Sequence, residues 1–478
     1  MKMKKILALG MSLAMVLGAV ACSSDKTDET TAGTTAAPAE TTAAPQEPEE
    51  TKEEPEETTA APEETASSTG TLEGFTDLGK QEATNEGDGK ILVWSWNTEV
   101  KEHVEKYSNV DFDFEEVGGG DQPAFRTALD QALASGDEAP DVYATDASWA
   151  QHYLKSDNSL AINTLGIDYG DLTNMYKYTL EFAADDEGVL KGLAWQACPC
   201  GIYYNTELAK EYLGVDAPED VAPFFATWDA FLQTAKDVNE KSEGKVKAIS
   251  GYDDVWQSYL NRRTSGWIVD GALNIDSNVE GYFDMAKQLH DDGLTFDTTQ
   301  WTDPWTNNVK NSSVLSYWGP MWLGQYSLAM ADESNPTYGQ WKMVNSPSPW
   351  YWGGTWLMAS GTCDMKADAG QIMYDVCANQ DNLKAMAKDG EFVNSIPVMT
   401  EVANDPSFGL DWLGGQNPFS ILLDTASTID NSMIGVNDGA INDLFTAAVG
   451  SYVSGDVETV AEAKASFEAA VKDANILD

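Results

Sequence analysis

The order of strand and helix signals between residues 91 and 149 constrains the fold most. The continuous apolar run from Ile91 to Trp94 is typical of a strand buried on both faces. An alternating strand at Val110 to Phe114 and a third strand at Asp141 to Ala144 follow, with helical spacing of apolar residues between them. This β-α-β-α-β order predicts a parallel sheet with right-handed crossovers, and therefore an α/β fold.

Polar and aromatic residues follow the first and third of these strands. Trp96, Asn97 and Glu99 come after the first strand, and Asp146 and Trp149 come after the third. Because open α/β sheets bind ligands at the carboxyl ends of their strands, we expect these side chains to share one rim of the sheet. An alternative for Asp146 is that its carboxylate only caps the next helix.

A second pairing of an acid with an indole follows a predicted strand at Val246 to Ser250. Asp254 and Trp256 occupy the loop after this strand, which suggests a second βαβ set with its own ligand-facing rim. The polar glycine loop that contains Asn417 is a further candidate contact, or merely a turn.

Two clusters of tryptophan lie beside glycine and proline residues. The first cluster holds Trp318 and Trp322, and the second holds Trp350, Trp352 and Trp356. Flat aromatic faces near loops suit sugar rings, whose C–H groups pack on the π face while their hydroxyls need polar partners. The alternative, that these indoles belong to the core, stays open, and the run Thr355 to Ala359 predicts a buried strand.

The first 84 residues are not expected to contribute to a folded core. Lysines and an apolar run from Ile6 to Val20 precede Cys22, which resembles a bacterial lipoprotein signal (residues 1–22) with Cys22 as the lipidated residue. A plain secretory signal is the alternative. Residues 23–84 are rich in Thr, Ala, Pro and Glu and predict a disordered tether with a reach between ~45 Å as a coil and ~200 Å when stretched. We therefore expect a lipid-anchored protein on the extracellular face of a bacterial, Gram-positive cell membrane.

The formal net charge of −50 restricts the partners. Nucleic acid and anionic membrane surfaces do not attract such a chain, and a polyanionic ligand is disfavoured, so a neutral ligand is the simplest expectation. The three histidines lack a metal-ligand spacing, and His103 and His290 are predicted on solvated helix faces. The cysteines lack a C-x-x-C spacing, so we expect no metal and no other cofactor. For Cys198 and Cys200 we expect two free thiols, with a strained bridge as the alternative.

Several motifs occur in an order that resembles the sugar-binding proteins of ABC importers, the cluster that includes maltose-binding protein. The motifs are Leu92 to Asn97, Pro140 to Ala144, Gly201 to Glu207, Ser316 to Trp322 and Trp352 to Trp356. The resemblance implies two α/β lobes, each a mostly parallel sheet flanked by helices, around a cleft. It implies a first lobe of residues 85–200 plus about 345–398, a second lobe of about 201–344 plus about 399–478, and chain crossings near 197–200, 344 and 397–430.

The resemblance also implies which residues contact the ligand. Where some relatives carry a carboxylate in the hinge segment, this chain has Cys198, so Gln196 is the expected contact instead. With the candidates above, the predicted ligand-binding residues are Trp96, Asn97, Glu99, Tyr143, Asp146, Trp149, Gln196, Asp254, Trp256, Trp318, Trp322, Trp350, Trp352 and Asn417.

The implied function is that of a monomeric receptor without catalysis, which captures a neutral oligosaccharide and delivers it to the permease of an ABC importer. Ligand shifts such a receptor toward a closed form that the importer recognises. One alternative is a glycoside hydrolase, which needs two carboxylates ~5–9.5 Å apart. A surface glycan adhesin without a transporter is the other. Shortening of the ligand would identify the hydrolase, and lobe closure separates the receptor from an adhesin.

Overall fold

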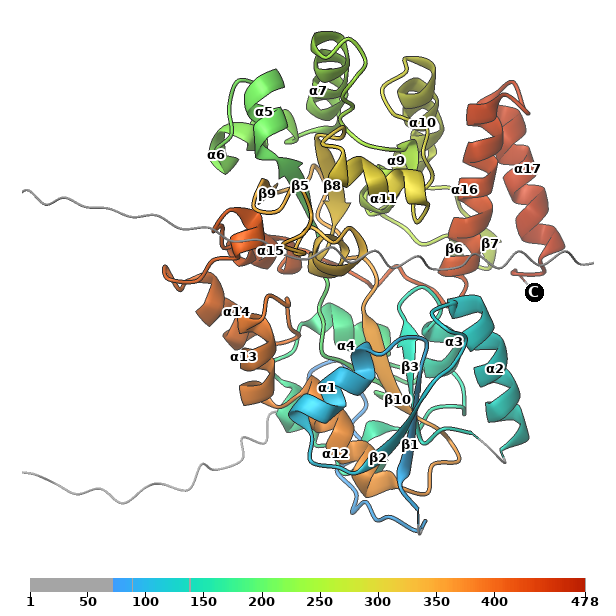
Figure 1. The fold of residues 1–478 in the computed structure, drawn as a ribbon. Helices are drawn as coiled ribbons and strands as arrows, with labels where there is room; N and C mark the ends of the chain where they lie inside the picture. The colour runs from blue at the N-terminus through green and yellow to red at the C-terminus, as the bar shows by residue number, and fades with distance from the viewer. Residues whose placement is uncertain (1–71, 88, 137–138, 478) are drawn as a thin grey trace, which may run out of the picture. The chain divides into compact units, whose positions relative to one another are not determined.

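The computed structural model describes residues 72–87, 89–136 and 139–477. The predicted lipoprotein signal with Cys22, and residues 23–71 of the predicted tether, lie outside the described residues. Within the described part, no helix combines the length and the apolar character needed to span a membrane. The described chain is an α/β fold with two main sheets and a separate two-stranded hairpin (Figure 1).

The sheet of the first lobe has five strands in the order β2-β1-β3-β10-β4. The strands are β1 (Ile91–Ser95), β2 (Phe112–Glu116), β3 (Val142–Asp146), β4 (Leu193–Ala194) and β10 (Thr355–Ala359). β1 pairs in parallel with both β2 and β3, which confirms the parallel arrangement predicted from the β-α-β-α-β order. β10 is the predicted buried strand, and it runs antiparallel to β3 and β4, so the sheet is mixed.

Helices flank this sheet, and their ends follow local sequence signals. They are α1 (Glu99–Tyr107), α2 (Gln122–Ser135), α3 (Gln151–Leu154), α4 (Lys177–Ala183), α12 (Lys366–Cys377) and α13 (Gln380–Lys388), with 3₁₀ turns η1 (Ile162–Leu165) and η2 (Tyr169–Leu172). At α2, the Asp121 carboxylate accepts a hydrogen bond from the Ala124 N–H at 2.7 Å, and Gly136 ends the helix with a φ of +75°. The capped start of α2 therefore lies close behind the end of β2, at the rim where the ligand was expected.

The sheet of the second lobe has the order β8-β5-β9, and both of its pairings are antiparallel. The strands are β5 (Gly201–Asn205), β8 (Ser316–Gly319) and β9 (Trp341–Val344), with a separate hairpin of β6 (Ile268–Val269) and β7 (Ala272–Leu273). This corrects the expectation of a mostly parallel sheet in each lobe. The predicted strand at 246–250 forms only a single parallel bridge, between Lys247 and Val314, so it adds no parallel strand.

The remaining helices complete the second lobe and the side of the molecule that joins the lobes (Figure 1). They are α5 (Thr206–Tyr212), α6 (Pro218–Val221), η3 (Ala222–Phe224), α7 (Trp228–Lys241), η4 (Tyr252–Val255), α8 (Trp256–Leu260), α9 (Ser277–Glu280), α10 (Tyr282–Asp291), α11 (Asp303–Lys310), the π-helical turn η5 (Leu323–Ser327), α14 (Ile396–Ala403), η6 (Asp411–Leu413), α15 (Phe419–Ala426), α16 (Asp438–Ser454) and α17 (Val460–Asp473). The buried residues of α14 and α15 belong to a core cluster that contains residues of both sheets, so this cluster does not assign residues 399–426 to one lobe.

The chain passes between the two sheets at residues 195–200 and 345–354. These are the segments in which the resemblance placed the first two crossings. Residues 427–437 lead from α15 to α16 and form a third connection. Buried apolar side chains gather in two clusters, of which the second consists of residues of the second lobe and the crossings.

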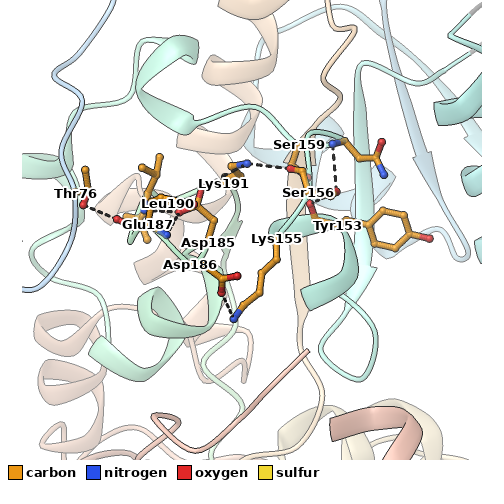
Figure 2. Close-up of polar contacts among 12 residues, drawn as sticks. Thr76, Tyr153, Lys155, Ser156, Ser159, Asp185, Asp186, Glu187, Leu190 and Lys191 are labelled. Atoms are coloured by element: carbon orange, nitrogen blue, oxygen red, sulfur yellow. Dashed lines mark hydrogen bonds and ion pairs between the residues drawn. The ribbon is translucent and has the colours of Figure 1, made fainter. Parts of the chain in front are cut away.

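Residues 72–84, the last part of the predicted tether, lie against the first lobe. The Thr76 hydroxyl donates to the Glu187 carbonyl at 2.6 Å, and the Gln81 N–H donates to the Asn163 carbonyl at 3.0 Å. Figure 2 shows Thr76 beside the turn that contains Glu187, where Lys191 and Lys155 pair with Asp185 and Asp186 at 3.5 and 2.8 Å. The folded body therefore includes a short segment that the sequence analysis placed in the tether.

Candidate functional site

A cavity of about 1120 Å³ lies between the two lobes. The loops after β1 and β3 line one wall, and the residues around α8, α11 and the start of α16 line the other. Both crossings contribute residues to the cavity floor, including Gln196 and Trp352. Pockets for drug-sized ligands usually measure ~300–1,000 Å³, so this cleft has room for a ligand of several rings.

Seven of the predicted ligand-binding residues line this cleft. They are Trp96, Asn97, Glu99, Asp146, Gln196, Trp322 and Trp352. The shared rim of β1 and β3 is confirmed, since the rings of Trp96 and Trp149 lie 5.7 Å apart. Asn97 lines the cleft and caps the first turn of α1, because its side-chain oxygen accepts a hydrogen bond from the Glu99 N–H at 3.2 Å. That these residues contact a ligand stays a prediction.

Glu99 connects the cleft to a buried network in the first lobe. Gln196 Nε2 donates to Glu99 Oε1 at 2.9 Å. Burial raises the pKa of Glu99 to about 7, and the charge of Glu391 adds to this effect. His103 is buried and pairs with Glu391 at 3.0 Å, which corrects its prediction as a solvated residue. The cleft wall therefore holds a carboxyl group that can either donate or accept a hydrogen bond near neutral pH.

Asp146 combines the two roles that the sequence left open. Its Oδ1 accepts hydrogen bonds from the Ser148 N–H at 2.9 Å and from the Ser148 hydroxyl at 2.6 Å. The carboxylate thus stabilises the turn after β3 while it also lines the cleft. Burial raises the pKa of Asp146, and the bonds from Ser148 oppose this shift.

An indole cluster of Trp301, Trp322 and Trp352 lines one part of the cleft. The ring centroids lie 6.2 Å apart for Trp301 and Trp322, 5.6 Å for Trp301 and Trp352, and 5.3 Å for Trp322 and Trp352. Trp322 Nε1 donates to the Trp352 carbonyl at 3.3 Å. Gly353 has a φ of +69°, and a Cβ there would lie 3.0 Å from the Trp322 ring, so the close approach of this ring requires glycine.

Comparison with known proteins identifies the family. Residues 102–412 match the profile of the family described as "Bacterial extracellular solute-binding protein". The chain belongs to this family. A curated relative, the lactose-binding protein of Rhizobium radiobacter, is 28% identical over 204 residues, which is 40% of this chain and 46% of the relative. The match thus spans less than half of that relative's length.

Solved structures show that this solute-binding protein has the two-lobed fold. A binding protein of B. animalis subsp. lactis in complex with β-1,6-galactobiose has a TM-score of 0.64, 18% identity, and coverage of 80% of this chain and 97% of its own. The galacto-N-biose-/lacto-N-biose I-binding protein of Bifidobacterium longum has a TM-score of 0.61, 15% identity, and coverage of 82% and 98%. A structure described as "Extracellular solute-binding protein family 1" has a TM-score of 0.67, 18% identity, and coverage of 81% and 99%.

The structure places the other seven predicted residues of the solute-binding protein outside the cleft lining, which corrects their placement. In the first lobe, Tyr143 points into the core, where its hydroxyl is hydrogen-bonded to Ser159 at 2.7 Å. Trp149 is buried behind Trp96 and donates its Nε1–H to Gln122 at 3.0 Å. Tyr143 lies on β3, whose side chains point to the faces of the sheet, and Trp149 lies in the turn after β3, where its ring packs against Trp96.

In the second lobe the corrected residues are an acid that holds a turn and indoles that fill the core. Asp254 accepts hydrogen bonds from Trp305 Nε1 at 2.6 Å and from the Ser250 and Gly251 N–H groups at 2.8 and 2.9 Å. Its carboxylate is therefore used within the lobe. Trp256 stacks on Phe445, with ring centroids 5.1 Å apart.

Three further corrections concern Trp318, Trp350 and Asn417. Trp318 stacks on Trp228 at 5.6 Å, and Trp350 lies 6.2 Å from Trp318, so the core alternative holds for both. The Asn417 amide donates to the Val402 carbonyl at 2.9 Å, which supports the alternative that its loop is a turn. The sequence alone does not show which tryptophan of each cluster packs in the core and which one faces the cleft.

Several residues that line the cleft of the solute-binding protein were not among those predicted from the sequence. Trp301, Arg263, Asp438, Gln151 and Tyr351 all line the cleft. Trp301 stands outside the tryptophan clusters, and its only unusual feature, a φ of +69°, is a property of the structure. Tyr351 lies between Trp350 and Trp352 of the second tryptophan cluster, whereas the other four residues belong to no spacing that marks a site.

The described cysteines form no disulfide, and the possible metal ligands of the described chain form no metal site. Cys198, Cys200, Cys363 and Cys377 are free and buried, which confirms free thiols over a strained bridge for the first two. Burial raises the pKa of both the Cys198 and the Cys200 thiol. Among the described residues, no three His, Cys, Asp or Glu side chains are grouped so that they could hold a metal ion.

Proposed function

We propose that this protein captures a neutral oligosaccharide in the cleft between its lobes and delivers it to the membrane permease of an ABC importer. The indole cluster of Trp301, Trp322 and Trp352 is the observation that carries the proposal. Indole faces bury the C–H side of a sugar ring, while Glu99, Asp146 and Gln196 in the same cleft offer partners for hydroxyl groups.

The relatives support a saccharide as the ligand. The curated relative is a lactose-binding protein, and two similar structures are described with β-1,6-galactobiose and lacto-N-biose. Carboxylates outnumber cations on the cleft wall, where Glu99, Glu102, Asp146 and Asp443 accompany two cations, Arg263 and His103, that are already paired with Asp438 and Glu391. An acidic sugar would therefore be repelled, which favours a neutral ligand.

Binding would shift the protein toward lobe closure. A ligand that contacts Asp146 in the first lobe and Trp301 in the second makes both sets of contacts only when the lobes are closed. We further propose that Cys22 carries the lipid and that the tether lets the receptor reach its permease, while the protein acts as a monomer without a cofactor.

Hydrolysis is the second candidate, because Glu99 has a pKa of about 7 that would suit a general acid. One experiment separates the two functions. The full chain is heated with and without a panel of neutral oligosaccharides, and each ligand is then recovered and weighed by mass spectrometry. A rise in the melting temperature with intact ligand supports the receptor. A shortened ligand identifies an enzyme, and the absence of any shift across the panel contradicts saccharide binding.

A further inference from the structure

The loop between α10 and α11 (residues 292–302) carries Trp301, the most exposed ring of the indole cluster. Two residues of this loop, Asp297 and Trp301, have left-handed backbone conformations, with φ of +52° and +69°. Such conformations are uncommon for residues other than glycine, and they persist where neighbouring groups fix the backbone. The contacts that fix this loop therefore decide where the Trp301 ring stands in the cleft.

Two adjacent carboxylates of the 3₁₀ turn η4 hold this loop on both sides of Trp301. Asp253 Oδ2 accepts a hydrogen bond from the Gln300 N–H at 3.0 Å. Asp254 Oδ1 accepts hydrogen bonds from Trp305 Nε1 at 2.6 Å and from Gln300 Nε2 at 3.4 Å. Gln300 immediately precedes Trp301, and Trp305 lies in the first turn of α11, so these bonds bracket the exposed indole.

The turn that supplies these carboxylates is itself fixed. Asp254 Oδ2 accepts hydrogen bonds from the Ser250 and Gly251 N–H groups at 2.8 and 2.9 Å. The Ser250 hydroxyl is hydrogen-bonded to the Thr298 hydroxyl at 2.6 Å. A Cβ added at Gly251 would collide with the Thr298 carbonyl oxygen, so the turn and the loop are in close backbone contact. The two acids thus belong to a closely packed junction between the turn and the loop.

The two aspartates act on the cleft from outside it. Asp253 and Asp254 are not among the described residues that line the cleft, so a ligand there can respond to them only through the loop. Burial raises the pKa of both carboxyl groups, because a charge is costly away from water. Trp305, which Asp254 fixes, is buried, and its ring lies 5.5 Å from the ring of Trp301. The chain therefore keeps two acids in a costly place where they support one exposed ring.

We infer that Asp253 and Asp254 are positioning residues, which hold residues 300–305 so that the Trp301 ring is already placed for stacking before a ligand arrives. The inference rests on the proposed function, and it assigns part of the ligand affinity to two side chains that the ligand does not touch. A ring that is placed in advance loses less conformational freedom on binding, which increases affinity. Loss of either carboxylate should therefore weaken binding through Trp301.

A double-mutant cycle on the full chain tests this link by calorimetry, with lactose, β-1,6-galactobiose and maltose as probes. Asp253→Ala removes the acceptor of the Gln300 N–H, whereas Asp253→Asn keeps a side-chain oxygen for that bond. In Asp254→Asn, the single oxygen stays on the two backbone N–H groups when the amide NH2 turns toward Trp305 Nε1–H, which breaks the bond to Trp305. Each of the three variants is combined with Trp301→Ala.

Asp185→Ala is the matched control. The Asp185 carboxylate also accepts hydrogen bonds from backbone N–H groups of a turn, those of Glu187 and Val189 at 3.0 and 2.9 Å, and its side chain is 10% exposed. This turn belongs to the first lobe, and these three residues do not line the cleft. Asp185→Ala should therefore lower the melting temperature and keep the affinity of wild type. The comparison separates the placement of the ring from a general loss of stability.

We expect Asp253→Ala and Asp254→Asn each to weaken the best-bound probe about fivefold or more, and Asp253→Asn to stay within about twofold of wild type. In the Trp301→Ala background, neither change should weaken binding further. Wild-type affinity in both variants, or losses that add to that of Trp301→Ala, would overturn the inference while the proposed function stands. If wild type binds no probe, the proposed function fails and the inference fails with it. Should one of the two variants not fold, the other decides.

Near-ultraviolet circular dichroism of the ligand-free proteins is the second readout, because stacked indoles contribute to this signal. The difference between wild type and Trp301→Ala should recur between wild type and Asp253→Ala. An Asp253→Ala spectrum that matches wild type would overturn the inference even where Trp301→Ala binds too weakly to complete the cycle.

Discussion

The indole of Trp301 stacks on the indole of Trp322, with ring centroids 6.2 Å apart and ring planes 20° from parallel. Trp301 is 57% exposed and has a φ of +69°, a left-handed conformation that bulky residues rarely adopt. The adjacent Gln300 N–H donates to Asp253 at 3.0 Å and helps to hold the loop in place. The proposal that Trp301 stacks on a sugar ring accounts for a large apolar ring that a strained backbone keeps exposed in the cleft.

Trp301→Ala should weaken saccharide affinity without unfolding the protein. Truncating a central aromatic contact typically costs about 2 kcal/mol, or roughly 30-fold in Kd. Little stability should be lost, since the ring is exposed. Trp305→Ala is the contrasting control, because Trp305 is buried and should cost about 3–5 kcal/mol of unfolding free energy. Calorimetry and urea unfolding measure both quantities, and unchanged affinity in Trp301→Ala would contradict the role of the indole cluster.

Glu99 should make the protein less stable as pH rises. Its pKa is about 7 in the folded state against an ordinary 4.5, so the folded protein retains a proton that the unfolded chain releases. The free energy of unfolding therefore falls between pH 4.5 and 7, by up to about 3 kcal/mol at ~1.4 kcal/mol for each pKa unit.

His103 acts in the same direction at higher pH. Burial lowers its pKa, but the hydrogen bond and charge of Glu391 raise it to about 9 from 6.5, so its contribution is lost as pH rises through that window. Glu99→Gln should flatten the stability curve below pH 7 and leave the slope above it. Urea unfolding at several pH values measures this, and parallel curves for variant and wild type would exclude Glu99 as the titrating group.

Gly439→Ala should hinder lobe closure. A Cβ at this position would collide with the Ser148 carbonyl of the other lobe, whereas a Cβ at Gly450 on the same helix meets only Tyr252, at 3.6 Å. We expect Gly439→Ala to lose about tenfold or more in ligand affinity, or ~1.4 kcal/mol, and to stay expanded when ligand is added. Gly450→Ala should behave like wild type. Small-angle scattering with and without the best saccharide measures closure, and equal compaction of both variants would reject the contact.

Asp438→Leu should destabilise the protein strongly. It leaves the Arg263 guanidinium buried without its partner, which typically costs about 3–5 kcal/mol. The double variant Arg263→Met with Asp438→Leu should recover most of that loss. Asp389→Ala is the control, because its ion pair with Lys106 is more than half exposed and should be worth at most about 1 kcal/mol. Thermal unfolding of wild type, the single variants Arg263→Met and Asp438→Leu, and the double variant gives the coupling energy, and additive losses would show that the two residues do not act as a pair.

Much of the first lobe was predictable from sequence because its signals are local. The apolar run at β1 and the alternation at β2 follow from the period of a strand, and their order requires parallel pairing. The same reasoning located Trp96, Asn97 and Glu99 at the rim. The same reasoning gave the wrong strand direction in the second lobe, because the direction there depends on how distant segments such as β5 and β9 pair.

Sequence by itself determined which segments could form a sheet. The negative charge of the chain disfavoured an anionic partner, and the indoles near loops marked candidate ligand contacts. Only the tertiary structure decided which indoles line the cleft. Trp318 and Trp352 have the same chemistry and similar glycine-rich surroundings, yet a strand turns the first into the core and a crossing leaves the second in the cleft. Pairings such as Arg263 with Asp438 join residues that are far apart in the chain, and no local pattern records them.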